Sequence, residues 1–296
     1  MYKEILNLLK CPKCNGELSL RVEKEESSEI VEGKLRCEGG HHWAISEGVI
    51  NFASVEQELA NNWTEAYEQY EDNDDELGKG ISEGNPKNLI ILSDEAKKFI
   101  IESINKNENE FILDIATGRG ALFIEMVKQL KGESQIICTD LSFIVLKYDR
   151  LRAKKINPGI KVNYISCDVT NLPFKDNTID TAVSFFGIAN MLDLAADGIK
   201  EAKRVLKVGQ TLLDSYIIIK EDSVGFKTLK EFCNENKVIG AEEFAIKTGI
   251  EKAYIKANFD KIDMVTIGES IGEKSDLDLL PFDGEWFAVV IAESIK

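Results

Sequence analysis

The chain has 296 residues, of which 44% are apolar, and its 52 acidic and 36 basic residues give a formal net charge of −16. No window approaches the roughly 18 to 20 apolar residues of a membrane helix, and the opening MYKEILNLLK lacks a secretory signal's apolar run and cleavage site. We therefore expect a cytoplasmic protein without membrane insertion. The acidic balance serves solubility and disfavours a surface that gathers phosphate backbones.

Composition divides the chain into three parts. Residues 1–55 hold both histidines and three of the six cysteines, and are too few to build a core without a metal or a docking surface. Residues 56–92 predict a helix near Glu58–Tyr70 followed by an acidic, glycine-containing linker. Residues 93–296 have the pattern of one larger domain, and short β-like runs precede it at Lys34–Cys37 and Val49–Phe52.

Apolar strands and amphipathic helices alternate from residue 93 onward, after a helix that Ser93 is predicted to cap and that ends near Asn105. The strand candidates are Phe111–Ala116, Gln135–Asp140, Val162–Cys167, Ile179–Phe186, Thr211–Ile219, Ile262–Gly268 and Trp286–Glu293. The helical candidates are Ala121–Lys131, Phe143–Lys155, Leu194–Leu206 and a longer region from Phe226 to Ala257. This alternation predicts an α/β fold with a doubly wound, mostly parallel, seven-stranded sheet. The last two strands have no helical pattern between them and predict a terminal antiparallel hairpin.

A glycine-containing turn follows the first strand, in FILDIATGRGALFIEMV. The strand ends at Asp114, and the turn runs through Thr117, Gly118 and Gly120 into a helix. Glycines there let the backbone approach a ligand closely. The dinucleotide pattern G-x-G-x-x-G/A requires glycine or alanine where this chain has Phe123, which disfavours a nicotinamide cofactor.

Two more carboxylates end the next two strands, Asp140 in ICTDLS and Asp168 in ISCDVTNLPF. Residues at the carboxyl ends of neighbouring parallel strands line a common crevice, so three carboxylates are expected to converge there. Each alone has the simpler interpretation of an aspartate that caps the next turn. Their spacing together with the glycine turn favours a binding site, whereas Asp180 is interpreted as an ordinary turn residue.

With these motifs, residues 93–296 resemble the class I S-adenosylmethionine-dependent methyltransferases. The runs NTIDTAVSFFGIANM and EAKRVLKVGQTLLDSY are similar to later motifs of the branch that includes quinone-biosynthesis methyltransferases. The resemblance implies that Asp114 and Gly118 lie by the methionyl end of S-adenosylmethionine. The implied set of cofactor-binding residues is Asp114, Ala116, Thr117, Gly118, Gly120, Asp140 (ribose), Leu141, Asp168 (adenine amine), Val169 (adenine ring) and Phe185, with Phe186 beside it. Ala116 departs from the glycine common in the family, and Val208-Gly209 departs from Pro-Gly.

The bunched cysteines predict a metal site. Cys11-Pro-Lys-Cys14 and Cys37-Glu-Gly-Gly-His41 offer three thiolates and an imidazole, which make a closed tetrahedral zinc site of structural type. Residues 8–55 also resemble the zinc ribbon of certain large-subunit ribosomal RNA guanine methyltransferases. That resemblance favours His41 as the fourth ligand, with His42 as the alternative. The remaining cysteines, at 138, 167 and 233, are interpreted as small buried apolar residues.

Methyl transfer from a sulfonium requires alignment and exclusion of water more than a general base. Both histidines are assigned to the metal, and no catalytic residue is assigned. Side chains of the linker helix (Asn62, Trp63, Tyr67 and Tyr70) either close over the crevice as a lid or pack on the domain.

Two acceptor classes compete. The zinc-ribbon resemblance fits ribosomal RNA, whereas the acidic composition and the quinone-type motifs favour a small molecule. A non-catalytic binding scaffold is the third hypothesis. The motifs carry no information on oligomeric state.

Overall fold

The computed structural model describes residues 1–54, 84–275 and 279–296. The helix predicted at Glu58–Tyr70 and the proposed lid side chains lie outside the described residues. Among those described, no helix is long and apolar enough to cross a membrane.

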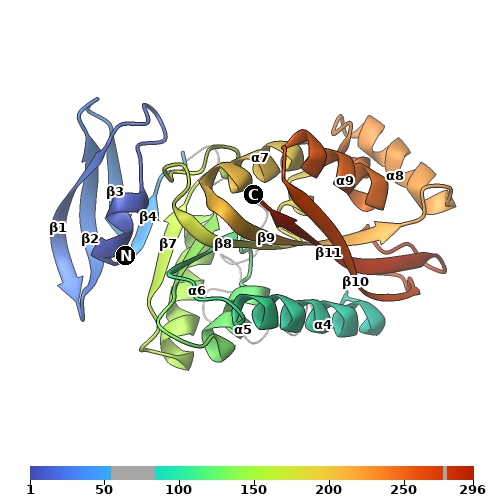
Figure 1. The fold of residues 1–296 in the computed structure, drawn as a ribbon, viewed down its shortest axis with the longest axis horizontal. Coiled ribbons are helices and arrows are strands. Elements are labelled where there is room, and N and C mark those ends of the chain that lie inside the picture. The colour runs from blue at the N-terminus through green and yellow to red at the C-terminus, as the bar shows by residue number, and fades with distance from the viewer. Residues whose placement is uncertain (55–83, 276–278) are drawn as a thin grey trace.

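One sheet runs through the molecule (Figure 1), and its central five strands are parallel. These strands are β7 (Val162–Ser166), β6 (Gln135–Asp140), β5 (Phe111–Ile115), β8 (Ile179–Phe185) and β9 (Leu206–Ile219), in that spatial order. Next to β9 lies β11 (Trp286–Ile295), which is antiparallel both to β9 and to the edge strand β10 (Lys261–Ile271). The predicted parallel sheet and terminal antiparallel hairpin are confirmed.

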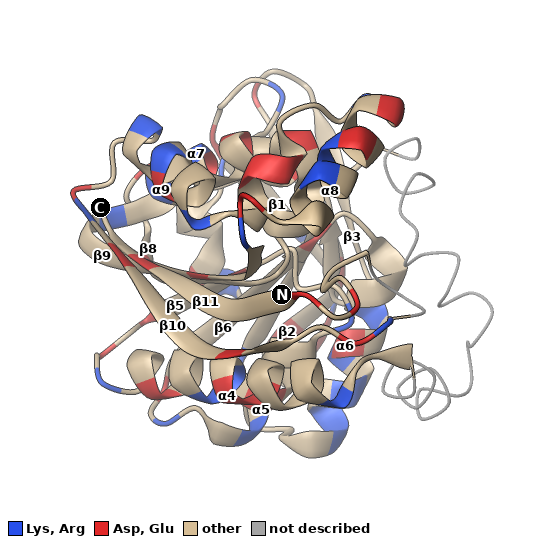
Figure 2. Ribbon diagram, turned by 90° about the vertical axis from the view of Figure 1, so that its right-hand side faces the viewer, with Lys and Arg blue, Asp and Glu red and all other residues tan. Residues whose placement is uncertain are grey.

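Helices cover both faces of the sheet. One face carries α4 (Lys87–Ile104), α5 (Ala121–Gln129) and α6 (Phe143–Ile156); the other carries α7 (Ala195–Val205), α8 (Val224–Glu235) and α9 (Lys247–Lys256). A hydrophobic core lies on each face, with Phe123 and Ile100 in one and Tyr216 and Ile199 in the other. The charged residues lie mainly on the helices (Figure 2), which leaves the central strands free to be buried on both sides.

The helix start predicted at Ser93 is wrong. The helix α4 begins six positions earlier at Lys87, after Pro86, and Ser93 lies in its interior. Leu89 and Leu92 are buried on the same stripe as Ala96, so the apolar helical pattern extends beyond the serine. Proline at the boundary is the better signal here because its fixed φ suits the first turn.

The N-terminal part extends the sheet. Its strands β1 (Leu18–Glu26), β2 (Glu29–Cys37), β3 (His42–Ser46) and β4 (Val49–Asn51) form an antiparallel meander, and β4 pairs in parallel with β7. The larger domain supplies the seven strands that were predicted, but because β4 pairs with β7 the sheet continues into the N-terminal part and has 11 strands in the described part of the chain. Burial of Ile5 and Leu9 with Phe174 and a buried ion pair of 2.7 Å between Glu29 and Arg150 of α6 fix this part on the larger domain. Docking thus supplies the core that residues 1–55 cannot build alone.

Candidate cofactor and metal sites

The turn after β5 is built around Asp114. This carboxyl is buried, and its Oδ2 accepts a hydrogen bond of 2.9 Å from Thr117 Oγ1. Its Oδ1 is also buried and has no hydrogen-bond partner among the described residues. Because a buried carboxylate oxygen without a partner is costly, this atom points to a ligand with a donor.

Left-handed backbone shapes the turn. Ala116, Gly118 and Gly120 have φ values of 53°, 54° and 70°, a region that glycine enters without cost and alanine does not. A Cβ at Gly120 would lie 2.8 Å from Asp149 Oδ1, so only glycine fits there. The methyl of Ala116 is accommodated because its neighbour is Gly187, where a Cβ would lie 2.8 Å from Ala116 Cβ.

Asp140, at the end of β6, joins that turn to the next one. Its Oδ2 accepts from the Gly118 N–H at 2.9 Å, and its Oδ1 accepts from the Ser142 N–H at 2.9 Å. Each carboxylate oxygen can accept a second hydrogen bond, so the side chain stays suited to a diol. Leu141, which follows it, is half-buried.

Asp168 follows β7 and caps the 3-10 helix η2 (Val169–Asn171). Its Oδ1 accepts from Thr170 N at 2.8 Å and from Thr170 Oγ1 at 2.7 Å, while Val169 is buried. The three predicted carboxylates thus lie at the ends of three adjacent strands, as expected. Asp180 lies within β8, not in a turn, where it accepts from Phe111 N and Lys207 Nζ.

Asp149 is a buried carboxyl that the sequence did not point to. It lies on α6 beside Gly120, where Arg152 donates to it and to the carbonyl of Arg119. Burial, Asp149 and Asp140 together raise the pKa of Asp114 to about 8. A cationic ligand next to Asp114 would reverse this shift, so the electrostatics of the turn favour a positively charged group.

A cavity of about 410 Å³ lies at the carboxyl ends of β8 and β9. Most of its lining is apolar: Leu89, Phe185, Phe186, Ile217, Leu229 and Phe244. The few polar groups include Arg119 of the glycine turn and Lys97, which forms an ion pair of 2.7 Å with Asp94. The rings of Phe185 and Phe186 lie 4.5 Å apart between their centroids, which places two aromatic walls beside the turn.

A second cavity, of about 490 Å³, lies at the other end of this row of strands. Asp168 and Asn171 line it from the larger domain, and Trp43, Asn51 and Phe52 line it from the N-terminal part. The candidate cofactor residues at the ends of β5 and β6 therefore have a cavity on each side.

The predicted metal ligands come together. The ligand atoms of Cys11, Cys14, Cys37 and His41 lie within 4.8 Å of one another, with Cys37 Sγ 3.3 Å from His41 Nδ1 and 3.5 Å from Cys14 Sγ. Burial opposes ionisation of Cys11, but hydrogen bonds from the Lys13 and Cys14 N–H groups lower its pKa to about 6 overall, which favours the thiolate that a metal requires. His42 is exposed at the start of β3 and is not part of this group.

The strand order, with its parallel centre and reversed last hairpin, is that of a methyltransferase-like α/β fold. The structure of a Bacillus halodurans protein, named a methyltransferase by inference, superposes with a TM-score of 0.50 at 20% identity and covers 69% of this chain and 99% of that one. At that identity the likeness shows the fold alone.

Comparisons of the amino-acid sequence show which methyltransferases this chain is similar to. A model of the ubiE/COQ5 methyltransferase family matches residues 90–226. A 2-phytyl-1,4-naphtoquinone methyltransferase of Nostoc sp. is 26% identical over 168 residues, which are 56% of this chain and 71% of that protein. A ubiquinone/menaquinone biosynthesis C-methyltransferase of Cellvibrio japonicus is 34% identical over 119 residues, 40% of this chain and 47% of that protein; that match spans about half of the relative.

The chain is therefore an S-adenosylmethionine-dependent methyltransferase, and the predicted enzyme class is confirmed. The family match lies entirely within the larger domain, so it does not test the zinc-ribbon resemblance of residues 8–55.

Proposed function

We propose that this enzyme methylates a small, largely apolar aromatic acceptor of the quinol type. The observation that carries the proposal is the apolar cavity of about 410 Å³ beside the glycine turn. Its size suits a small molecule, and the relatives reported above are named for quinone substrates. Neither those relatives nor the family model supports the ribosomal RNA alternative.

The residues at the strand ends suit S-adenosylmethionine, which when bound supplies an electrophilic methyl group on a sulfonium. Asp114 offers an unpartnered buried oxygen and a negative environment to the ammonium group. Asp140 would accept from the ribose hydroxyls, and Asp168 from the adenine amine. Ala116, Thr117, Gly118 and Gly120 would contact the methionyl part through the backbone, and Leu141 and Val169 would pack against the adenine.

The acceptor side is defined by aromatic walls and two cationic side chains, Lys97 and Arg119. Phe185 and Phe186 would exclude water and hold the acceptor ring against the methyl group, which is the main requirement of an in-line displacement. Lys97 would stabilise the oxyanion of an ionised quinol, the form with the most nucleophilic ring carbon. Methyl transfer would leave S-adenosylhomocysteine, and the methylated ring carbon would release its proton to solvent as the ring regains its aromaticity.

We also propose that Cys11, Cys14, Cys37 and His41 bind one structural zinc ion. Three thiolates and one imidazole are a ligand set that zinc prefers, and four protein ligands leave no position for a reactive water. The proximity of their ligand atoms, which lie within 4.8 Å of one another, supports this proposal.

The acceptor proposal is tested by transfer of labelled methyl groups from S-adenosylmethionine to a panel of naphthoquinols and benzoquinols, with ribosomal RNA alongside. We expect label in the quinols only. Filling the cavity with Ala245→Phe should raise the KM for the quinol at least tenfold while S-adenosylhomocysteine binding is unchanged. Val208→Phe, at a position that is 77% exposed, is the control. Label in RNA and not in any quinol would refute the proposal.

A further inference from the structure

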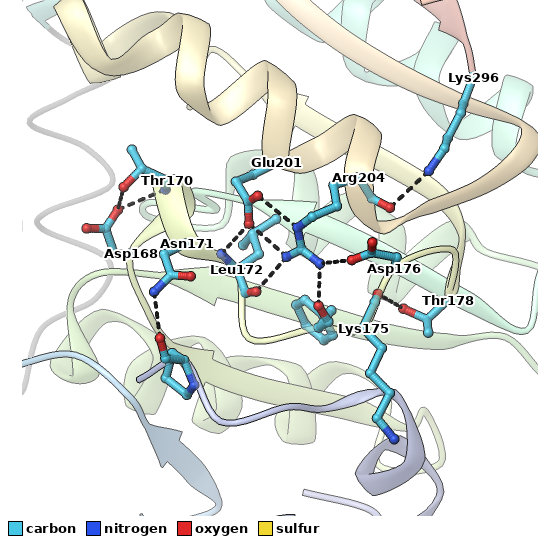
Figure 3. A network of polar contacts seen from close by, with 12 residues as sticks. Asp168, Thr170, Asn171, Leu172, Lys175, Asp176, Thr178, Glu201, Arg204 and Lys296 are labelled. Carbon is cyan, nitrogen blue, oxygen red and sulfur yellow. Dashed lines mark hydrogen bonds and ion pairs between the residues drawn. The ribbon is translucent and has the colours of Figure 1, made fainter. Parts of the chain in front are cut away.

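The N-terminal part contacts the loop that carries Asp168 (Figure 3). Asn171 Nδ2 donates to the carbonyl of Pro12 at 3.0 Å. Two backbone hydrogen bonds reinforce this contact, from Lys10 N to Pro173 O at 3.0 Å and from Lys175 N to Leu8 O at 2.7 Å. Because Pro12 lies between Cys11 and Cys14, the accepting carbonyl belongs to the metal-binding turn itself.

The same loop is held from the opposite side by α7. Glu201 accepts from Leu172 N at 2.9 Å, while Arg204 donates to Leu172 O at 2.8 Å and to Phe174 O at 2.6 Å. The loop after Asp168 thus lies between a fixed helix and the metal-binding turn.

The cavity of about 490 Å³ lies at this junction and has the surroundings of a site for a planar, amine-bearing ring. Trp43 and Phe52 contact each other edge to face, with centroids 5.2 Å apart, and supply an apolar wall. Asn51 Oδ1 is buried and has no hydrogen-bond partner in the described part of the chain. Asn51 and Asp168 are both lining residues of the cavity, and their amide and carboxylate groups suit an exocyclic amine.

We propose that the N-terminal module (residues 1–54) forms the outer wall of the adenine end of the cofactor site, and that metal binding there strengthens cofactor binding. The inference rests on the proposed cofactor and metal sites. A metal held by Cys11 and Cys14 fixes the Pro12 carbonyl and, through Asn171, the position of η2. By linkage, the cofactor must strengthen metal binding by the same factor.

Titration calorimetry with S-adenosylhomocysteine tests the linkage on the whole chain, first loaded with zinc and then after zinc removal by a chelator. We expect about tenfold weaker binding without zinc, and a matching rise in zinc affinity, measured against a chelating dye, at saturating S-adenosylhomocysteine. Far-UV circular dichroism checks that the metal-free protein is folded. Equal affinities in a folded metal-free protein would overturn the linkage.

Two variants test the wall without removing the metal. Asn171→Ala should keep its zinc content and bind S-adenosylhomocysteine three- to tenfold more weakly. Asn51→Leu should bind it more weakly yet unfold at a higher temperature, because an unpaired buried oxygen is removed; a purely structural role would not lower affinity. Glu17→Ala is the matched control, since it removes an exposed ion pair of 2.8 Å with Lys175 between the same two parts.

Wild-type affinity in both variants would overturn the proposal even if the chain is a working methyltransferase. If the zinc-loaded wild type binds no S-adenosylhomocysteine at all, the proposed cofactor site fails instead. If Asn171→Ala loses its zinc or unfolds, Asn51→Leu, which is remote from the Cys11–Cys14 turn in sequence, decides the outcome.

Discussion

Asp114 and Asp214 lie on strands β5 and β9 of the same sheet, and both are almost completely buried. Burial raises the pKa of Asp114 to about 8 and that of Asp214 to about 7. Their surroundings differ. Asp214 Oδ2 accepts hydrogen bonds from the hydroxyls of Tyr216 and Tyr254, the latter at 2.9 Å, whereas Asp114 faces a glycine turn.

This difference shows that a raised pKa marks burial and does not by itself mark a binding site. Asp214 is enclosed by the side chains of Tyr216 and Tyr254, and neither Asp214 nor Asp114 lines one of the two cavities described above. Both carboxyl groups have a buried Oδ1 without a hydrogen-bond partner among the described residues, but of the two Asp114 alone has left-handed glycines beside it and two further carboxylates nearby. We infer that Asp214 is a core residue and that Asp114 is a ligand-binding residue. Variants at the two positions separate these roles.

The largest effect is expected for Asp214→Ala. The change leaves the Tyr216 and Tyr254 hydroxyls buried without their acceptor and opens a small cavity, so the free energy of unfolding should fall by about 3 to 5 kcal/mol. Urea denaturation measures it. Asp214→Asn keeps an acceptor and should cost much less, with S-adenosylhomocysteine affinity within twofold of wild type. Loss of binding in a folded Asp214→Asn protein would show that Asp214 belongs to the binding site and would contradict its assignment as a core residue.

Asp114→Asn should lower the affinity for ligand and leave the free energy of unfolding unchanged, the opposite of what is expected at Asp214. It removes the charge that would pair with the ligand ammonium, so S-adenosylhomocysteine binding should weaken by about 10- to 100-fold, which corresponds to roughly 1.4 to 2.8 kcal/mol. The free energy of unfolding at pH 7.5 should not fall, because no buried donor loses its acceptor oxygen. Calorimetry on this variant and on Asp214→Asn gives the contrast directly; equal affinities would contradict it.

The pH dependence of ligand affinity should also differ between variants of Asp114 and Asp214. Asp114 is protonated below its raised pKa of about 8, and a cationic ligand requires the carboxylate, so affinity should rise with pH and level off above that value. The expected gain between pH 6.5 and 8 is roughly tenfold, since each proton released gives up to a factor of ten per pH unit. Asp114→Asn should abolish the slope and Asp214→Asn should retain it. A flat wild-type profile would show that Asp114 does not pair with the ligand.

The raised pKa of Asp114 also determines how the stability of the fold depends on pH. The folded pKa of Asp114 lies above the unfolded value of 3.8, so the stability that its proton contributes is complete below pH 3.8 and is lost as the pH rises through about 8. Raising the pH therefore strengthens binding while it weakens this contribution to folding, which is typical of a buried group that serves a ligand.

Patterns of local sequence were sufficient for the central strands of the larger domain. The parallel strands β5 to β9 are rich in apolar residues because both faces are buried. Asp114 and Asp140 lie near the carboxyl ends of β5 and β6, and Asp168 lies two residues after β7. The grouping of Cys11, Cys14 and Cys37 was also predicted from short spacings, whereas the choice of His41 over His42 came from the zinc-ribbon resemblance.

Features that depend on contacts between distant segments were not predictable. Strand β1 is mostly exposed and polar, so it has no apolar run, and nothing local shows that β4 pairs with β7. Asp149 and Arg204 lie on ordinary amphipathic helices, and their roles arise only where those helices meet Gly120 and the loop after Asp168.

The smallest effect is expected at Ala116, the alanine that replaces the family's usual glycine. Its φ of 53° costs an L residue roughly 1 to 2 kcal/mol, while glycine loses about 0.5 to 1 kcal/mol more backbone entropy on folding. Ala116→Gly should therefore raise the free energy of unfolding by up to about 1 kcal/mol and leave S-adenosylhomocysteine affinity within twofold. Gly187→Ala is the contrasting variant, because its Cβ would lie 2.5 Å from the Ala116 carbonyl oxygen and should destabilise the protein. If Ala116→Gly is instead less stable than wild type, the packing of its methyl on Gly187 outweighs the backbone strain, and the alanine stabilises the turn that holds Asp114.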